Sequence, residues 1–369
     1  MVRSSRHADR ALTSTERYPH VEVVRGAPAL LAVGDVQGNG DALFDLLERT
    51  GYARREADGA MAWTGRDRVL LLLGDLVDGG TQPAEVLAAV TSLHGQARRA
   101  GGRVVVLRGN HEMMLLRALA MGALPTSGEK WFTEGGLDTL ARLAAARGAT
   151  IPDDVVSACF APRLADFSEL APTIAPLLDL VRREYDEVLT FLDSETLSAA
   201  LVNGCVLAVH AAPNFAAERV ATFVETEAEV IDVAWARAWV RVWPADAAGL
   251  AARLAALKSR LDTEDGVCVR HIVFGHTPQD ELMAPGFPKG RQYRVGRLIA
   301  PDAASGVPGL YNLLTVPREI SPGGALGGLC FDADGVAAVY GRSPGENDGR
   351  WPERDPLGEA DPAFVGGGL

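Results

Sequence analysis

The stretch VLLLLGDLVDGG at residues 69–80 decides how the rest of the chain is interpreted. Five apolar residues lead into Gly74 and Asp75, and a second carboxylate follows at Asp78. A short run of Val and Leu that ends at a glycine predicts a strand buried on both faces. Because the polar residues come directly after this strand, we expect them at the carboxyl end of a sheet, where open α/β sheets bind ligands.

The same arrangement occurs four more times along the chain. A short apolar run leads into a polar cluster at residues 29–39, 104–112, 206–210 and 272–278. Helical patterns follow the first three of the five strands, at about residues 41–50, 83–100 and 112–119. These patterns predict an α/β (α+β) fold whose polar clusters meet at strand ends.

The remaining segments suggest how the chain is organised. Residues 1–27 are polar and weakly patterned, and residues 343–369 are rich in Gly, Pro and acidic residues, so we expect two irregular tails. The domain between them, 28–342, contains a mostly helical stretch at about 126–201, which we interpret as an insertion or cap. Residues 310–340 read as strands with glycine turns.

Composition excludes some classes of function. The chain has 369 residues, of which 47% are hydrophobic, and a formal net charge of -12. An acidic surface repels the nucleic-acid backbone, so we expect no general nucleic-acid binding. The sequence has no apolar run long enough for a membrane span and no signal-peptide core, which predicts a cytoplasmic protein with no membrane partner.

The polar clusters together offer a ligand set for transition metals. Carboxylates, amides and imidazoles are typical ligands of Mn, Fe and Zn, and one carboxylate can bridge two cations. Glycines beside the ligands let the backbone turn sharply. The residues that the strand ends present are Asp35, Gln37, Asp75, Asp78, Asn110, His111, His210 and His276.

These clusters resemble the motifs of calcineurin-like metallophosphoesterases, in particular the bacterial phosphoprotein-phosphatase branch with its Shewanella-like and phage-lambda-like members. The motifs are GDVQG at 34–38, GDLVDGG at 74–80, GNHE at 109–112, VH at 209–210 and GHTP at 275–278. Residues 131–140, with Gly135 and Gly136, and the segment WAR at 235–237 also look like the phage-lambda-like enzymes. The resemblance implies two facing mixed β-sheets flanked by helices, with metals at one edge.

The resemblance also implies roles for single residues. Two divalent cations are expected, Mn first and Fe or Zn as alternatives, with a bridging hydroxide that attacks the phosphate. The implied ligands are Asp35 and Gln37 for the first ion, Asp75 for both ions, and Asn110, His210 and His276 for the second. His111, held by Asp78, is the implied general acid, and Arg237 is the implied phosphate-binding residue together with Asn110.

Two departures from the family pattern bear on the substrate. Gln37 stands where the family has a histidine, as it does in some related dinucleoside-tetraphosphate hydrolases, and Gly79 stands where the family has a phosphate-binding arginine. A neutral amide oxygen is a weaker ligand than imidazole, so we expect the first metal site to bind more loosely. The basic residues that could replace the missing arginine are Arg108, Arg117, Lys130 and Arg270.

The sequence leaves three functions open. The first is a phosphomonoesterase, with phosphoserine and phosphothreonine proteins as one substrate class. The second is a hydrolase of dinucleoside polyphosphates or other small phosphate esters. The third is a weakened protein that keeps the fold for binding or regulation. The partner is therefore a phosphorylated protein or a small phosphate ester, and the oligomeric state stays open.

Overall fold

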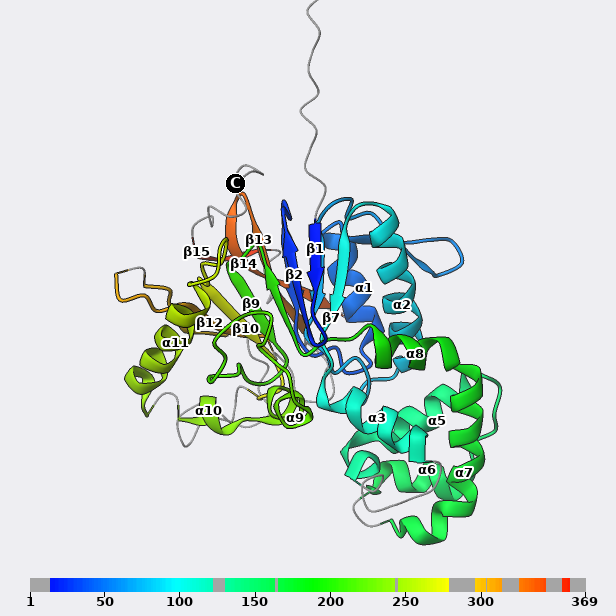
Figure 1. Ribbon diagram of the computed structural model, residues 1–369. Helices are drawn as coiled ribbons and strands as arrows, with labels where there is room; N and C mark the ends of the chain where they lie inside the picture. The colour runs from blue at the N-terminus through cyan, green and yellow to red at the C-terminus, as the bar shows by residue number, and fades with distance from the viewer. Residues whose placement is uncertain are drawn as a thin grey trace, which may run out of the picture.

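Two large β-sheets face each other in the computed structural model, and helices cover their outer sides (Figure 1). The structure describes residues 14–121, 130–162, 165–242, 245–278, 296–302, 304–313, 325–342 and 354–358. The expected fold of two facing mixed sheets flanked by helices is confirmed.

One sheet has seven strands of mixed direction. In spatial order they are β1 (Ser14–Arg17), β2 (Val21–Arg25), β8 (Ala199–Val202), β9 (Val206–Val209), β10 (His271–Phe274), β12 (Gly309–Asn312) and β11 (Gly296–Ile299). Strands β9 and β10 run parallel, so their carboxyl ends lie at the same edge of the sheet.

The other sheet has six strands. In spatial order they are β15 (Asp355–Gly358), β14 (Gly335–Arg342), β13 (Ala325–Asp332), β3 (Leu30–Val33), β6 (Val69–Leu72) and β7 (Arg103–Val106). Strands β3, β6 and β7 are parallel neighbours, which brings the loops that follow them together.

Alternating side chains of the buried strands fill two different layers. In β3, Leu30 faces the apolar layer between the sheets, whereas Leu31 packs under the helices α1 (Gly40–Arg49) and α2 (Pro83–Arg99). This explains why β3 and β6 are continuous apolar runs, because a strand covered on both faces exposes no side to water. On the outer face of the seven-stranded sheet, three further helices pack: α9 (Glu227–Trp235), α10 (Ala238–Arg241) and α11 (Ala247–Leu261).

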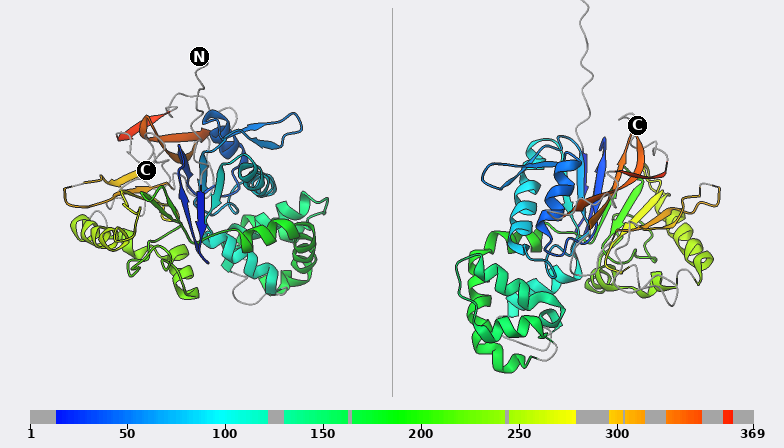
Figure 2. Two further views of the ribbon diagram at one scale, coloured as in Figure 1. Left: turned by 45° about the horizontal axis from the view of Figure 1, so that its top comes forward. Right: turned by 180° about the vertical axis from the view of Figure 1, so that it is seen from behind.

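A lobe of helices extends from the six-stranded sheet (Figures 1 and 2). Its elements are α3 (Asn110–Met121), the π-type turn η1 (Phe132–Gly136), α5 (Leu137–Ala145), α6 (Asp153–Phe160), α7 (Phe167–Glu184) and α8 (Asp186–Ser194). In the part of the expected insertion (126–201) that the structure describes, helices continue to Ser194, and residues 199–202 already form β8. The domain boundaries themselves stay a prediction.

The prediction that both ends of the domain are irregular tails was partly wrong. Inside the expected tail 1–27, residues 14–17 form β1 and residues 21–25 form β2, because β2 pairs with β8 in the seven-stranded sheet and its Val21 and Val23 are buried under the outer helices. Within 343–369, residues 355–358 form β15, which pairs with β14 at the edge of the other sheet. Within the two expected tails, the structure also describes residues 18–20, Gly26, Ala27 and Arg354. The remaining residues of both tails lie outside the described part of the chain.

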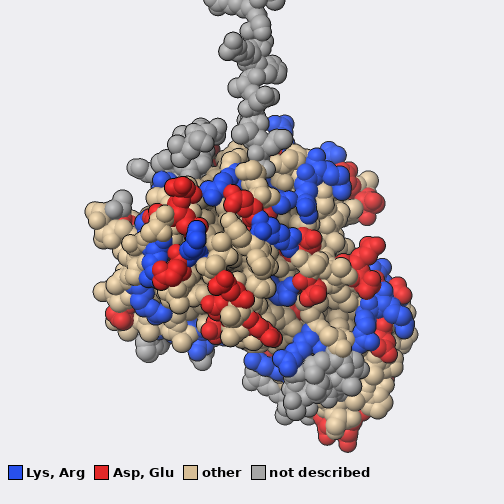
Figure 3. All heavy atoms as spheres, viewed as in Figure 1, with Lys and Arg blue, Asp and Glu red and all other residues tan. Residues whose placement is uncertain are grey.

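A two-stranded sheet stands apart from the two large sheets. Strands β4 (Ala53–Arg55) and β5 (Met61–Trp63) form a separate hairpin. Acidic and basic side chains are interspersed over the face shown in Figure 3. In the part of the chain that the structure describes, no helix is both long and apolar enough to cross a membrane.

Candidate metal centre

Five loops bring the expected site residues together at the strand ends. They follow β3, β6, β7, β9 and β10. The residues that these loops carry are Asp35, Gln37, Asp75, Asp78, Asn110, His111, His210 and His276, and all of them are buried.

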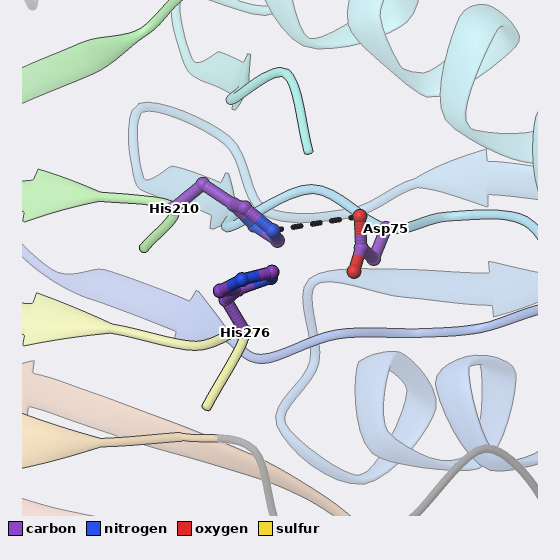
Figure 4. A group of neighbouring side chains, drawn as sticks. All are labelled: Asp75, His210 and His276. Atoms are coloured by element: carbon purple, nitrogen blue, oxygen red, sulfur yellow. Dashed lines mark ion pairs between the residues drawn. The ribbon is translucent and has the colours of Figure 1, made fainter. Parts of the chain in front are cut away.

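Asp75, His210 and His276 form the centre of this group (Figure 4). Each offers a ligand atom, and these atoms all lie within 4.8 Å of one another. Nε2 of His210 is 3.5 Å from Oδ1 of Asp75, and the two imidazole rings are 5.1 Å apart between their centroids. One carboxylate and two imidazoles at this spacing are suited to a divalent transition metal.

The hydrogen bonds of His210 test whether a cation fits here. Its Nδ1 lies 2.6 Å from the carbonyl oxygen of Leu73 and donates to it, because that oxygen can only accept. Burial lowers the pKa of His210, so the ring is neutral and Nε2 carries a lone pair. That lone pair faces Oδ1 of Asn110 at 3.2 Å and Oδ1 of Asp75 at 3.5 Å, and both of these are acceptors too. Three electron-pair donors that converge without a proton between them fit a cation.

His276 has a comparable arrangement. Its Nε2 is 3.2 Å from the carbonyl oxygen of Trp235, and Nε of Arg237 lies 3.0 Å from the same nitrogen. In the tautomer with a proton on Nε2, that N–H donates to the carbonyl of Trp235 and Nδ1 carries the lone pair that a metal requires. In the other tautomer, Nε2 accepts the Nε–H of Arg237. The same contact places Arg237 directly beside the group.

Asp35 is held next to His276 by the backbone. The N–H group of His276 lies 3.1 Å from Oδ1 and 3.0 Å from Oδ2 of Asp35. A Cβ atom on Gly275 would lie 2.0 Å from Oδ1 of Asp35, and one on Gly109 would lie 2.1 Å from Oδ1 of Asp75. Both glycines are therefore required, because any side chain would displace a carboxylate.

Burial raises the free-energy cost of ionising Asp35 and Asp75 when no counter-charge is nearby. It raises the pKa of Asp35 to about 7, although the nearby His210 acts in the opposite direction. Burial also raises the pKa of Asp75. A bound cation would supply the missing positive charge.

His111 and Asp78 form a pair at the edge of the group. Nδ1 of His111 lies 2.6 Å from Oδ2 of Asp78, and its Nε2 lies 3.9 Å from Oδ2 of Asp75. Burial by itself would lower the pKa of His111, but the carboxylates of Asp75 and Asp78 outweigh it and raise the pKa to about 9. The ring is thus oriented by one carboxylate and directed toward the other.

The backbone of the site is strained. Positive φ angles occur at Gln37 (47°), Asp75 (48°), Asp78 (69°) and His276 (59°). Among the described non-glycine residues, only Arg66 and Asn203 share this conformation. L-residues rarely adopt positive φ, and such strain concentrates at functional sites.

Comparison with known proteins agrees with this geometry. The family model described as calcineurin-like phosphoesterase matches residues 29–161. This segment carries the first three polar clusters, and the loops after β9 and β10 add the two histidines.

Two curated proteins are similar to parts of this chain. Shewanella-like protein phosphatase 2 of Arabidopsis thaliana is 31% identical over 85 residues, which are 23% of this chain and 21% of that protein. An uncharacterized protein of Schizosaccharomyces pombe is 36% identical over 83 residues, or 22% of this chain and 24% of that protein. The chain thus spans less than a quarter of the length of these relatives.

Solved structures of phosphatases are similar to this chain at lower sequence identity. A cold-active protein-tyrosine phosphatase of a psychrophilic Shewanella species has a TM-score of 0.42 and 19% identity, covering 87% of this chain and 80% of that one. A serine/threonine phosphatase from Saccharomyces cerevisiae has a TM-score of 0.42 and 14% identity, covering 87% and 81%.

Two residues of the candidate metal centre had no role assigned from sequence. Glu112 is fully buried, and its carboxylate accepts backbone N–H groups from Asp75, Leu76 and Gly109. Its place in the GNHE motif was the available signal. The second residue, Trp131, donates its indole N–H to Asp78, and only its likeness to phage-lambda-like enzymes drew notice to it.

The departures Gln37 and Gly79 have identifiable backbone roles. The N–H group of Gln37 donates to the carbonyl of Asp75 at 2.6 Å, and its own carbonyl accepts from Gly80 at 2.7 Å, so it joins the loops after β3 and β6. Gly79 has a φ of 98°, which an arginine would adopt only with strain.

Two of the candidate replacement cations, Arg108 and Lys130, occupy different surroundings. Arg108 is committed to the end of α8, where it donates to Thr196 and to the carbonyl of Leu192. Lys130 instead lies at the edge of the site, with Nζ 4.1 Å from the ring centroid of Trp235.

Proposed function

We propose that this protein is a metal-dependent phosphoesterase that hydrolyses phosphate monoesters, with phosphoserine and phosphothreonine proteins as one substrate class. One observation carries the proposal: Asp75, His210 and His276 converge beside an ion-paired His111 and Asp78. A metal-ligand group next to an imidazole that can deliver a proton is the equipment that ester hydrolysis needs.

The proposed metal ligands divide into two sets. Asp75 is proposed to bridge two divalent cations, Mn in the first place and Fe or Zn as alternatives. The remaining ligands are Asn110, His210 and His276 for one ion and Asp35 and Gln37 for the other. When bound, divalent cations neutralise the charge of a phosphate group and acidify water at the site.

His111 is proposed as the general acid. Its Nδ1–H group donates to Asp78, so Nε2 is the atom that delivers a proton to the departing oxygen of the ester. An alkoxide is a poor leaving group until it is protonated, which makes this step important for alkyl esters. Asp78 fixes the ring orientation and stabilises the charged form of His111.

Arg237 and Asn110 are proposed to bind phosphate oxygens. Arg237 lies beside His276, and a guanidinium group can donate to two phosphate oxygens at once. Asn110 starts α3, next to His210. A second candidate function, hydrolysis of dinucleoside polyphosphates, is favoured by Gln37.

Metal analysis combined with turnover tests the proposal. The protein prepared without chelator, or reloaded with Mn, is expected to bind about two ions per chain and to hydrolyse an aryl phosphate. Asp75→Asn is expected to lose both metal and activity. The matched control is Asp193→Asn, whose side chain is 76% exposed and lies near Arg108.

Substrate class is decided by the same preparation. Phosphopeptide, aryl phosphate and dinucleoside tetraphosphate are compared by kcat/KM. Faster hydrolysis of the dinucleotide would favour the second candidate. A metal-loaded protein that hydrolyses none of the three would refute the enzyme and leave a binding or regulatory role.

A further inference from the structure

The helical lobe places an indole against the His111–Asp78 pair. Nε1 of Trp131, just before the turn η1, donates to Oδ2 of Asp78 at 2.8 Å. Nδ1 of His111 lies 2.6 Å from the same oxygen. The other carboxylate oxygen, Oδ1, is buried and has no hydrogen-bond partner among the described residues. One oxygen of Asp78 therefore receives both donors.

This sharing determines how the carboxylate can rotate. The terminal torsion of an aspartate is soft, so a single donor leaves the plane of the carboxylate poorly defined. Two donors from different directions define it, because a rotation that favours one bond lengthens the other. Trp131 thereby constrains the oxygen that orients His111.

The turn after Trp131 is shaped to hold the indole in this position. A Cβ atom on Gly136 would lie 2.2 Å from the ring of Trp131. Gly135 has a φ of 108°, and a Cβ atom there would lie 3.3 Å from Cβ of Asp78. Gly136 therefore leaves room for the indole ring, and Gly135 leaves room for the loop that carries Asp78. Trp131 itself is fully buried.

A neighbouring contact ties the same segment to the opposite side of the site. Nζ of Lys130 lies 4.1 Å from the centroid of the Trp235 ring, at cation–π distance. The carbonyl of Trp235 in turn contacts His276. The start of the lobe is thus joined both to the Asp78 loop and to the segment that carries Arg237.

We propose that Trp131 is a positioning residue for the acid–base pair: its indole N–H orients Asp78, and through Asp78 it holds His111 in the geometry for proton delivery. The inference rests on the proposed function of His111. It makes the helical lobe part of the reaction site, because the lobe supplies one of the two donors to Oδ2 of Asp78.

Leaving-group dependence distinguishes positioning from packing. Trp131→Phe keeps an aromatic ring but removes the N–H donor. With an alkyl phosphate, kcat is expected to fall about tenfold, a usual effect of losing an orienting partner. With a nitrophenyl phosphate, which needs little protonation, kcat is expected to change less than about twofold. In a His111→Ala background the substitution should have no further effect on the alkyl ester.

Two further variants control for altered folding. Benzothienylalanine at position 131 keeps the bicyclic shape and replaces the N–H group by sulfur, so it should reproduce the kinetic effect without a packing defect. Trp63→Phe is the matched control, since this indole also donates at 3.0 Å, to the carbonyl of Arg66 in the β5 region. It is expected to leave the ratio of the two substrates unchanged.

The proton between His111 and Asp78 provides a readout without turnover. A hydrogen bond this short to a carboxylate gives a far-downfield proton resonance, which is assigned by its loss in His111→Ala. Either position-131 replacement should shift or broaden it. An unchanged resonance, or equal losses on both esters, would overturn the positioning role. If the wild-type protein hydrolyses no ester, the proposed function fails, and the resonance still decides whether Trp131 orients the pair.

Discussion

Replacing Glu112 by glutamine isolates one buried carboxylate that joins two loops of the site. Oε2 of Glu112 accepts the N–H groups of Asp75 at 2.8 Å and Gly109 at 3.0 Å, while Oε1 accepts that of Leu76 at 2.7 Å. Glutamine has nearly the same shape but offers only one acceptor atom. Its amide nitrogen must therefore face a backbone N–H group.

The loss can be estimated from these bonds. If the glutamine oxygen keeps Asp75 and Gly109, the N–H group of Leu76 loses its acceptor inside the protein. A hydrogen bond to a charged group contributes about 1.5–3 kcal/mol, and an unsatisfied buried donor costs a similar amount. We expect Glu112→Gln to lower the free energy of unfolding by about 2–3 kcal/mol.

Denaturant unfolding of the metal-free protein measures this change. The matched control is Glu48→Gln, because Glu48 also accepts a backbone N–H, that of Arg55 at 2.8 Å, but on the surface. Water can replace a bond there, so we expect a loss below about 0.5 kcal/mol. Equal losses for the two variants would refute the reasoning that burial makes Glu112 decisive.

Three further predictions concern Gln37, Arg237 and His94. Gln37→His should raise the metal affinity of the first site and its preference for Zn or Fe, as measured by competition with a chelator. An unchanged affinity would refute the prediction that the Gln37 amide is a weaker ligand than imidazole. Arg237→Ala should mainly raise KM for a phosphate monoester, whereas an unchanged KM would exclude phosphate contact. His94 has a pKa lowered by burial from 6.5 to about 4, so the unfolded state binds its proton first as pH falls. The contribution of neutral His94 to the free energy of unfolding is complete above pH 6.5 and decreases toward pH 4, by about 1–2 kcal/mol after allowance for partial exposure. His94→Gln should therefore reduce the dependence of the free energy of unfolding on pH in that range, and an unchanged dependence would contradict the prediction.

The regular elements around the site were predictable because each motif has a local signature. The expected helices at about 41–50, 83–100 and 112–119 correspond to α1, α2 and α3. The valine-rich strand β2 was missed, since its five residues lie within a polar stretch and only the neighbouring strand β8 shows that they are buried.

The candidate site divides in the same way. Asp75 and His210 were identified from the order of the polar clusters, although 135 positions separate them, because each cluster follows an apolar run. The roles assigned to them stay predictions. The sequence did not predict the backbone conformation of Gly79. Its φ of 98° is one that an arginine adopts only with strain.

The order of five polar clusters, each placed after a buried strand, is written in the sequence, because residue type and strand periodicity are local properties. Which atoms meet was decided only by the tertiary structure. Trp131 lies 53 positions from Asp78, and no pattern in the chain indicates that they share a hydrogen bond. That contact depends on how the helical lobe packs against the loop after β6, and packing depends on the whole core rather than on any single motif.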